Sequence, residues 1–254
     1  MEPLKFMPAP PWRFCCIDLE TDNGRPDEVE REVALTFRGF LTLKPETAGR
    51  KYFEAIEAKK EKLALLNGAP IRVVTIRSDS AFLCLHDLAK TSGEPQARIV
   101  AGFPAIVQGL ESERALLLAL RQLLDERVAE ETTIVGHNIR HFDLRKLRHR
   151  FLKNGLQLPA ALAWKEQPTF DTMKHYCDHV SLRGEIMISL AHVLDELGLV
   201  NHKLDLDGSQ VPRYIAEGRH DELIDYALKD VLAEAELYLR LAGQAGDVEP
   251  AVTA

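Results

Sequence analysis

The chain has 254 residues, 46% of them hydrophobic and 28% charged, and its 39 acidic and 32 basic residues give a formal net charge of -7. This length allows one large domain or two small ones, and the apolar fraction is sufficient for a sizeable core. The negative charge excludes a protein that coats nucleic acid or an anionic membrane through bulk charge alone, although it allows local basic patches.

Two further features bear on the class of protein. The four cysteines (Cys15, Cys16, Cys84 and Cys177) show no C-x-x-C spacing, and we expect them to be reduced and mostly buried. Residues 1–13 contain no apolar run typical of a signal peptide, and nowhere do about 18 consecutive apolar residues occur. We therefore expect a cytoplasmic protein without a membrane span.

In the N-terminal half, short strands are predicted to alternate with polar and helical segments. A short apolar run predicts a buried strand over 14–19, and the polar stretch 21–32, which contains Asn-Gly and Pro, predicts a loop. Apolar residues at helical spacing predict an amphipathic helix over 47–67 that ends at Gly68. Two strands over 71–78 and 81–87 are expected to form a hairpin.

The C-terminal half is predicted to be mainly helical. Dense leucine spacing predicts a helix over 112–128, followed by a short strand over 132–136 and a helix with a charged face over 142–153. Further helices are predicted over 189–197, 211–217 and 221–241, and a disordered tail over 243–254. Early strands and later helices indicate an α/β protein with a mixed sheet and a single domain.

Two carboxylates stand at the end of the first predicted strand, in the sequence Cys-Ile-Asp-Leu-Glu-Thr. Because residues two apart on a strand face the same side, Asp18 and Glu20 are expected to project together. Carboxylates side by side repel each other unless they are protonated or bound to cations. Taken alone, this segment fits a solvated acidic strand end better than a metal site.

Two later segments carry further acidic residues. Asp143 follows Gly-His-Asn-Ile-Arg-His-Phe, where a strand turns into a helix and an acid also suits the helix dipole. Tyr226 and Asp230 stand four apart in the last helix and so share one face. Apolar neighbours indicate a closely packed helix, in which an Asp needs a partner such as a cation. Taken singly, Asp143 fits a capping acid and Asp230 a surface acid.

Together these segments resemble the motifs of the DEDD 3′-to-5′ exonuclease superfamily, the DnaQ-like group with a ribonuclease-H-like fold. The first motif of that superfamily, D-x-E, matches Asp18 and Glu20. Its second motif, N-x2–3-(F/Y)-D, matches Asn138, Phe142 and Asp143.

The third motif of the superfamily is either Y-x3-D or H-x4-D. Tyr226 and Asp230 fit the first form, and Asp225 stands where the second form requires His. The chain therefore resembles the tyrosine (DEDDy) branch, and within it stand-alone exonucleases related to the exonuclease domain of B-family DNA polymerases. Asp171 also has counterparts near the sites of relatives, although it fits a structural hydrogen-bond acceptor equally well. Residues 65–70, 208–211 and 230–232 show a weaker similarity to the same stand-alone exonucleases.

The resemblance spans about residues 14–241 and implies a ribonuclease-H-like mixed β-sheet flanked by helices. Residues 1–13 and 242–254 are expected to be tails outside this domain. One departure is a helical insertion at about 22–70, where many relatives continue directly into the next strand. We expect this insertion either to shape substrate access or to bind a partner.

The resemblance also implies two bound divalent cations, Mg²⁺ or Mn²⁺, because hard carboxylate oxygens suit hard metals. By resemblance, Asp18 bridges both cations, Glu20 and Asp230 complete one site, and Asp143 holds the second. Two such cations can stabilise the attacking and leaving oxygens of a displacement at phosphorus. Tyr226 would orient the attacking water, and the 3′-terminal nucleotide would leave as a 5′-monophosphate. These five side chains are the expected catalytic residues.

The implied substrate is a nucleic acid with a free 3′ end, and single-stranded DNA is favoured. Leu19 or Phe142 is expected to wedge against the terminal base. Thr21 and Asn138, which lie in the same motif segments, are also expected to contact the substrate. Basic side chains of the predicted helix after Asp143, among them Arg145, would contact other phosphates unless they form only a solvated face.

Other functions have less support in the sequence. His137 and His141, and the alternating His175, Cys177 and His179, lack the matching ligands of a zinc site. The alternatives are a 3′-to-5′ exoribonuclease, an endonuclease on the same fold and a catalytically silent nucleic-acid or partner-binding module. All four motif carboxylates and the tyrosine are present, which favours an enzyme.

Overall fold

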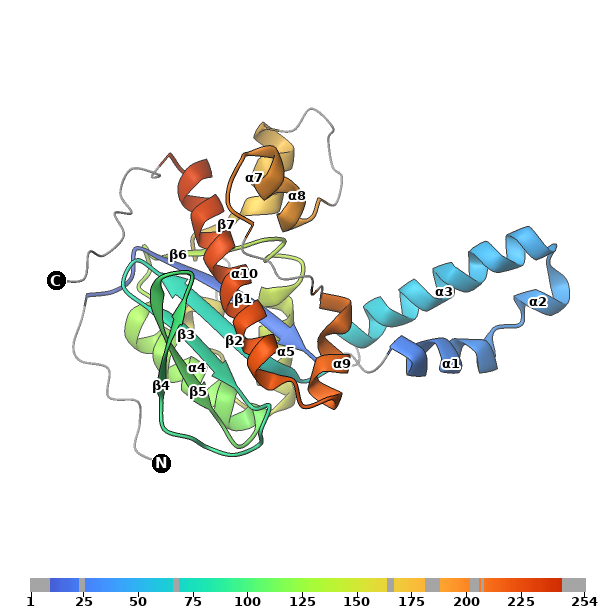
Figure 1. Ribbon diagram of the computed structural model, residues 1–254, viewed down its shortest axis with the longest axis horizontal. Coiled ribbons are helices and arrows are strands. Elements are labelled where there is room, and N and C mark those ends of the chain that lie inside the picture. The colour runs from blue at the N-terminus through green and yellow to red at the C-terminus, as the bar shows by residue number, and fades with distance from the viewer. Residues whose placement is uncertain are drawn as a thin grey trace.

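A computed structural model describes residues 10–22, 26–65, 69–163, 167–180, 188–201, 206 and 208–243 (Figure 1). It confirms the predicted α/β class, because one mixed sheet of seven strands carries helices on both faces. A helical arm, residues 26–65, extends away from this body beyond one end of the sheet (Figure 1).

The sheet consists of β1 (Phe14–Thr21), β2 (Ile71–Ser78), β3 (Phe82–His86), β4 (Gln96–Val100), β5 (Phe103–Gly109), β6 (Thr133–Gly136) and β7 (Thr169–Asp171). Their order across the sheet is β4-β5-β3-β2-β1-β6-β7. Strand β1 pairs antiparallel with β2 and parallel with β6, and the β2–β3 pair is antiparallel. The expected hairpin is confirmed at 78–80, where the Ser78 hydroxyl accepts hydrogen bonds from the N–H groups of Ser80 and Ala81.

The helices lie in the arm and on the two faces of the sheet. They are α1 (Pro26–Thr36), α2 (Gly39–Thr42), α3 (Pro45–Leu65), α4 (Glu113–Arg127), α5 (Asp143–Lys153), α6 (Ala160–Ala163), α7 (Thr172–His179), α8 (Leu190–Glu196), α9 (Val211–Ala216), which follows a 3₁₀ turn (Gly208–Gln210), and α10 (His220–Leu241). Each helix predicted from the sequence is present with similar bounds. Gly68 and residues 244–254 lie outside the described part of the chain.

Residues 21–32 do not form the loop that their Asn-Gly and Pro residues predict. Thr21 ends β1, and α1 begins at Pro26; residues 23–25 lie outside the described residues. Proline suits the first helical position because an N–H there would have no partner in the helix and because its fixed φ is already helical. The loop prediction is therefore wrong from Pro26 onward.

Strand β1 divides the core into two layers by simple alternation. Cys15, Ile17 and Leu19 pack on the face covered by α4 and α5, whereas Phe14 and Cys16 pack on the face covered by α10. Asp18 and Glu20 continue the second series, since residues two apart on a strand face the same side. The pleat thus directs both carboxylates toward α10.

The folded domain begins before Phe14. Trp12 is buried, its N–H donates to the carbonyl of Arg127 (2.9 Å), and its own carbonyl accepts from the Thr132 hydroxyl (2.6 Å). Trp12, which lies within the expected N-terminal tail, is thus bonded to the end of α4 and to the residue before β6. All four cysteines carry free thiols, and three of them are buried as expected. Within the described ranges, no helix has the length and hydropathy needed to cross a bilayer.

Candidate functional site

Strand β1 and helix α10 form opposite walls of the candidate site. On β1, Asp18 and Glu20 point toward α10, and on α10, Tyr226 and Asp230 lie one turn apart on a shared face. Thr75, the β2 partner of Asp18 in the sheet, donates its hydroxyl hydrogen to the carbonyl of Ala227 (3.3 Å). This buried hydrogen bond fixes α10 over the sheet beside Asp18.

The carboxylates of Asp18, Glu20 and Asp230 form one cluster. One oxygen of each lies within 4.8 Å of the other two; Glu20 and Asp230 are buried and Asp18 is half-buried. In the described ranges, no other group of three or more His, Cys, Asp or Glu side chains has this spacing. Carboxylate oxygens are the donors that Mg²⁺, Mn²⁺ and Ca²⁺ prefer. The cluster therefore fits a hard divalent cation.

A cavity of about 300 Å³ opens beside the cluster, within the size range of small-ligand pockets. It is lined by Asp18, Leu19, Glu20, Thr21, Phe142, Gly208, Tyr226 and Asp230. Of the residues expected to contact substrate, Leu19, Thr21 and Phe142 line this cavity, whereas Asn138 and Arg145 do not. Gly208 has no predicted role, although it begins a segment that resembles the exonucleases; a side chain added there would point into open space.

Tyr226 lies between the carboxylates and the apolar core. Burial raises the pKa of its phenol well above the ordinary value, and the charges of Glu20, Asp230 and Asp18 raise it further. A hydrogen bond with the Asp230 carboxylate acts in the same direction. The hydroxyl therefore remains protonated at neutral pH; its proton is donated to Asp230, and its oxygen can accept a hydrogen bond from a water in the cavity.

Asp143 occupies the first position of α5, as expected, and is buried. It lies outside the three-carboxylate cluster and does not line the cavity. Burial raises the pKa of Asp143, and the Asp18 charge and then that of Asp171 add to this; hydrogen bonds from its own N–H and that of Leu19 act in the opposite direction. Asp143 is therefore close enough to Asp18 to interact electrostatically with the cluster.

Glu234 is a further buried acid that we did not predict for the site. Its Oε1 accepts the backbone N–H of His137 (3.2 Å), and its Oε2 has no hydrogen-bond partner among the described residues. Burial raises the pKa of Glu234, with added contributions from the charges of Asp18, Asp143 and Asp230. Its position four residues after Asp230 on the same helix face is the sequence signal that would have found it.

Asn138 and Asp171 build the turn that leads into α5. Asn138 has φ 63°, a left-handed conformation that Asn tolerates well, and its carbonyl accepts the N–H groups of His141 and Phe142 (both 3.1 Å). Asp171 accepts the N–H groups of Asn138 (3.1 Å) and Lys174 (3.1 Å), and so caps α7 as well. These contacts support the interpretation of Asp171 as a structural hydrogen-bond acceptor.

Helix α5 presents only part of the basic face that its sequence predicts. Lys146 and Arg150 are only 1% and 6% exposed, and Arg150 forms a buried ion pair with Glu113 of α4. Burial, assisted by the Arg150 charge, lowers the pKa of Lys146 to about 8. Arg145 is exposed. The expected phosphate-binding surface is therefore smaller than predicted, because α5 turns part of its basic face toward α4.

His137 has structural partners instead of zinc-ligand geometry. Its ring nitrogens lie 3.1 Å from the Thr172 hydroxyl and 2.8 Å from the Ile188 carbonyl. The rings of His175 and His179 contact each other at a tilt of 56°, with centroids 4.8 Å apart. Over the described ranges, no His or Cys joins a candidate metal-binding group.

Comparison with models of protein families matches residues 71–253 to a family described as predicted 3′-5′ exonucleases related to the exonuclease domain of PolB. The matched part contains Asp143, Tyr226 and Asp230 and begins after β1, so Asp18 and Glu20 lie outside it. A search of curated proteins finds no match.

Proposed function

The chain belongs to the family of predicted 3′-5′ exonucleases related to the exonuclease domain of PolB, and we propose that it removes nucleoside 5′-monophosphates from the 3′ ends of single-stranded DNA. Membership of this family implies a nucleic-acid substrate. The proposed reaction requires divalent cations. The observation that carries this proposal is the cluster of Asp18, Glu20 and Asp230 beside a cavity. The likeness to the DEDDy motifs supports the direction of cleavage and the use of Mg²⁺ or Mn²⁺.

The donor set supports a cation-dependent enzyme. Asp18, Glu20 and Asp230 would hold the first divalent cation, and Asp143, whose carboxyl interacts with Asp18, would contribute to the second. When bound, the cations supply charge stabilisation for the attacking and leaving oxygens at the scissile phosphorus. Without cations, the buried acids raise one another's pKa, as seen for Asp143 and Glu234.

The side chains around the cavity would position the reacting groups. The protonated hydroxyl of Tyr226 would orient the attacking water by a hydrogen bond. The water oxygen bonds to phosphorus and the water gives up a proton to solvent, the bond between phosphorus and the 3′ oxygen of the preceding nucleotide breaks, and that oxygen takes up a proton from solvent to become the new 3′ hydroxyl. Phe142 lines the cavity and would stack against the terminal base, whereas the Leu19 side chain is buried in the core on the opposite face of β1.

Strands labelled at either end test the proposal directly. With Mg²⁺ or Mn²⁺, a single strand labelled at its 5′ end should shorten stepwise, and one labelled at its 3′ end should release labelled mononucleotide first. Asp230→Asn, which keeps the size of the side chain, should abolish both products. RNA and duplex DNA, assayed under the same conditions, show which nucleic acid is digested fastest. Cleavage of circular single-stranded DNA, or digestion at wild-type rate by Asp230→Asn, would overturn the proposal.

A further inference from the structure

The arm, residues 26–65, is inserted where the candidate site meets the end of the sheet. It connects β1 to β2, whose last pair is Thr21 with Ile71, and Thr21 lines the cavity. Beyond this pair the N–H of Asp22 donates to the carbonyl of Pro70 (3.0 Å) and closes the base of the arm. The arm therefore starts directly beside the site and extends outward (Figure 1).

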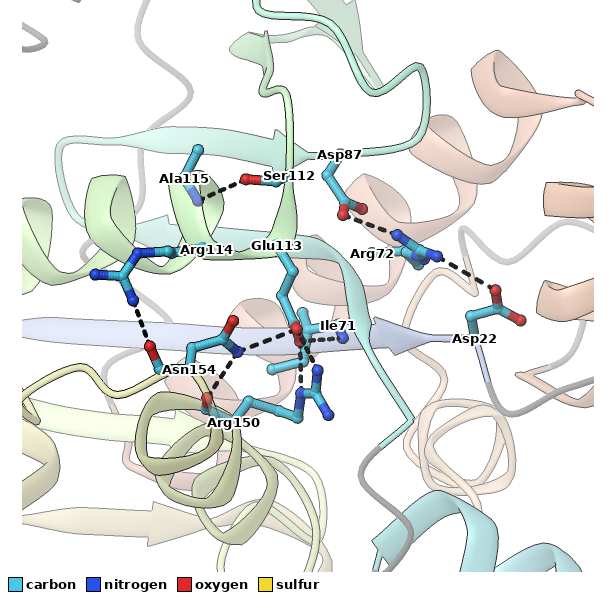
Figure 2. Close-up of polar contacts among 10 residues, drawn as sticks. All are labelled: Asp22, Ile71, Arg72, Asp87, Ser112, Glu113, Arg114, Ala115, Arg150 and Asn154. Carbon is cyan, nitrogen blue, oxygen red and sulfur yellow. Dashed lines mark hydrogen bonds and ion pairs between the residues drawn. The ribbon is translucent and has the colours of Figure 1, made fainter.

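Two polar networks hold the base of the arm to the body (Figure 2). Arg72 pairs with Asp87 (2.8 Å) and with Asp22 (3.6 Å), which joins both sides of the base. Next to it, the N–H of Ile71 donates to Glu113 Oε1 (2.8 Å), and Arg150 and Asn154 donate to the same carboxylate (Figure 2). The base is thus fixed by buried and half-buried contacts.

The outer end of the arm, residues 35–53, exposes large apolar side chains; we term it the arm tip. Phe40 and Phe53 are 59% and 68% exposed and are the exposed phenylalanines among the described residues. The Tyr52 ring contacts both, with ring centroids 5.2 and 6.3 Å away, and Leu35 and Leu41 are also exposed. Exposed apolar groups gathered in one place indicate a binding surface.

The charge of the arm tip indicates a polyanionic partner. It carries four basic residues and one acidic residue, Glu46, a balance of +3 in a chain of net charge -7. The basic residues, all exposed, are Arg38, Lys44, Arg50 and Lys51; Arg50 pairs with Glu54 just beyond the tip (3.6 Å), which leaves Arg38, Lys44 and Lys51 for a partner. Aromatic side chains among cations are the composition that binds single-stranded nucleic acid, by stacking on bases and pairing with phosphates. A purely apolar partner would not account for this excess of positive charge.

The length of the arm sets how much substrate it can reach. Helix α3 has 21 residues and is therefore about 30 Å long. At about 3.4 Å per stacked nucleotide, the far end of α3 corresponds to about nine nucleotides, and Phe53, about 18 Å along the helix from Leu65, to about five. A strand with its 3′ end in the cavity would therefore meet the arm tip only if it is longer than a short oligonucleotide.

We infer that the arm tip is a second binding surface for the single-stranded substrate, several nucleotides away from the 3′ end. Phe40 and Phe53 stack on bases there, and Arg38, Lys44 and Lys51 contact phosphates. This inference rests on the proposed function only for the placement of the 3′ end in the cavity. Binding of nucleic acid by the arm tip requires no catalysis and can be measured separately.

Fluorescence anisotropy in EDTA, where no cleavage is expected, measures this binding. Phe40→Ala with Phe53→Ala should weaken binding of a single strand of about thirty nucleotides by about tenfold or more and leave one of about three nucleotides unchanged. Ile99→Ala, at a 70% exposed apolar residue of β4, is the matched control and should bind both strands like the wild type. Replacing Arg38, Lys44 and Lys51 together by Glu should make the slope of log K against the logarithm of salt concentration shallower by about 2.

Several outcomes separate this inference from the proposed function. Long-strand binding that is unchanged in both arm-tip variants, with unfolding temperatures like the wild type, would overturn the inference. If these variants instead convert a dimer to a monomer in analytical ultracentrifugation without affecting binding, the surface serves a second copy of the chain and the inference fails. If the wild type digests no strand but binds the long one through the arm tip, the proposed function fails and the inference stands.

Discussion

Asp18 and Asp230 come from opposite ends of the chain, yet a carboxylate oxygen of one lies within 4.8 Å of an oxygen of the other. Their proximity depends on α10 crossing the sheet beside β1, where Thr75 bonds to Ala227. The unfolded chain has no such cluster, so binding of a cation there is linked to folding. Asp18 lies before the part of the chain that matches the exonuclease family, and the fold brings it to the matched Asp230.

Divalent cations should stabilise the folded protein. At about a hundredfold excess over the Kd, Mg²⁺ or Mn²⁺ should raise the unfolding temperature by about 5–10 °C relative to EDTA, since selective binding to the native state contributes about 2.7 kcal/mol. Differential scanning fluorimetry measures this shift. Asp18→Asn, which removes one charge but keeps the shape of the side chain, should lose most of it. Equal rises in unfolding temperature for the wild type and Asp18→Asn would contradict cation binding at Asp18.

Tyr226→Phe should slow catalysis while leaving cation binding intact. The variant keeps the ring in the core and removes only the hydroxyl that is expected to orient the attacking water. Loss of this positioning should lower kcat by about 10²-fold. Single-turnover digestion of labelled DNA measures the rate, and the cation-induced rise in unfolding temperature serves as the control. An unchanged kcat would remove Tyr226 from the mechanism.

Glu234 should be replaceable by Gln but not by Ala. Glu234→Gln keeps an oxygen that accepts the N–H of His137, and burial together with the nearby acids already disfavours the charged form. Glu234→Ala leaves that N–H without its acceptor and should cost about 1–3 kcal/mol of unfolding free energy. Urea denaturation in EDTA compares the two variants. Equal losses of stability would show that the negative charge itself is required.

Acid should destabilise the protein through His86 of β3. Burial, with the charges of His220 and Arg98, lowers the pKa of His86 to about 4, while in the unfolded chain it is about 6.5. Between these values the unfolded state binds more protons, so the free energy of unfolding falls as pH decreases from about 6.5 to 4, by at most about 3 kcal/mol. His86→Gln should flatten this dependence in urea titrations. If the free energy of unfolding depends on pH in the same way in the wild type and in His86→Gln, His86 is not the group responsible.

Local periodicity predicts which side chains are paired on one element, and the resemblance to the exonuclease motifs joins these pairs into one expected site. The period of two on β1 places Asp18 beside Glu20, and the period of four on α10 places Tyr226 beside Asp230. The same period would have included Glu234, but an acid in a helix is ordinarily exposed, and only the packing of α10 against the loop at His137 buries it.

Features that depend on tertiary packing could not be predicted. Lys146 and Arg150 have the charge of a surface helix, and they are buried because Glu113 on α4 provides a partner for Arg150. Strand β4 forms one edge of the sheet, where exposed residues such as Ile99 break the alternation typical of a half-buried strand. Proline at position 26 signals a turn as well as a helix start, and the sequence does not distinguish them.

Crystals soaked in Mn²⁺ and measured for anomalous scattering would show whether the three carboxylates bind a divalent cation. We expect anomalous density enclosed by the carboxylates of Asp18, Glu20 and Asp230, and its loss in crystals of Asp230→Asn grown and soaked alongside. A soaked wild-type crystal with no density at these three carboxylates, from a preparation that digests DNA with Mn²⁺ in solution, would contradict this expectation.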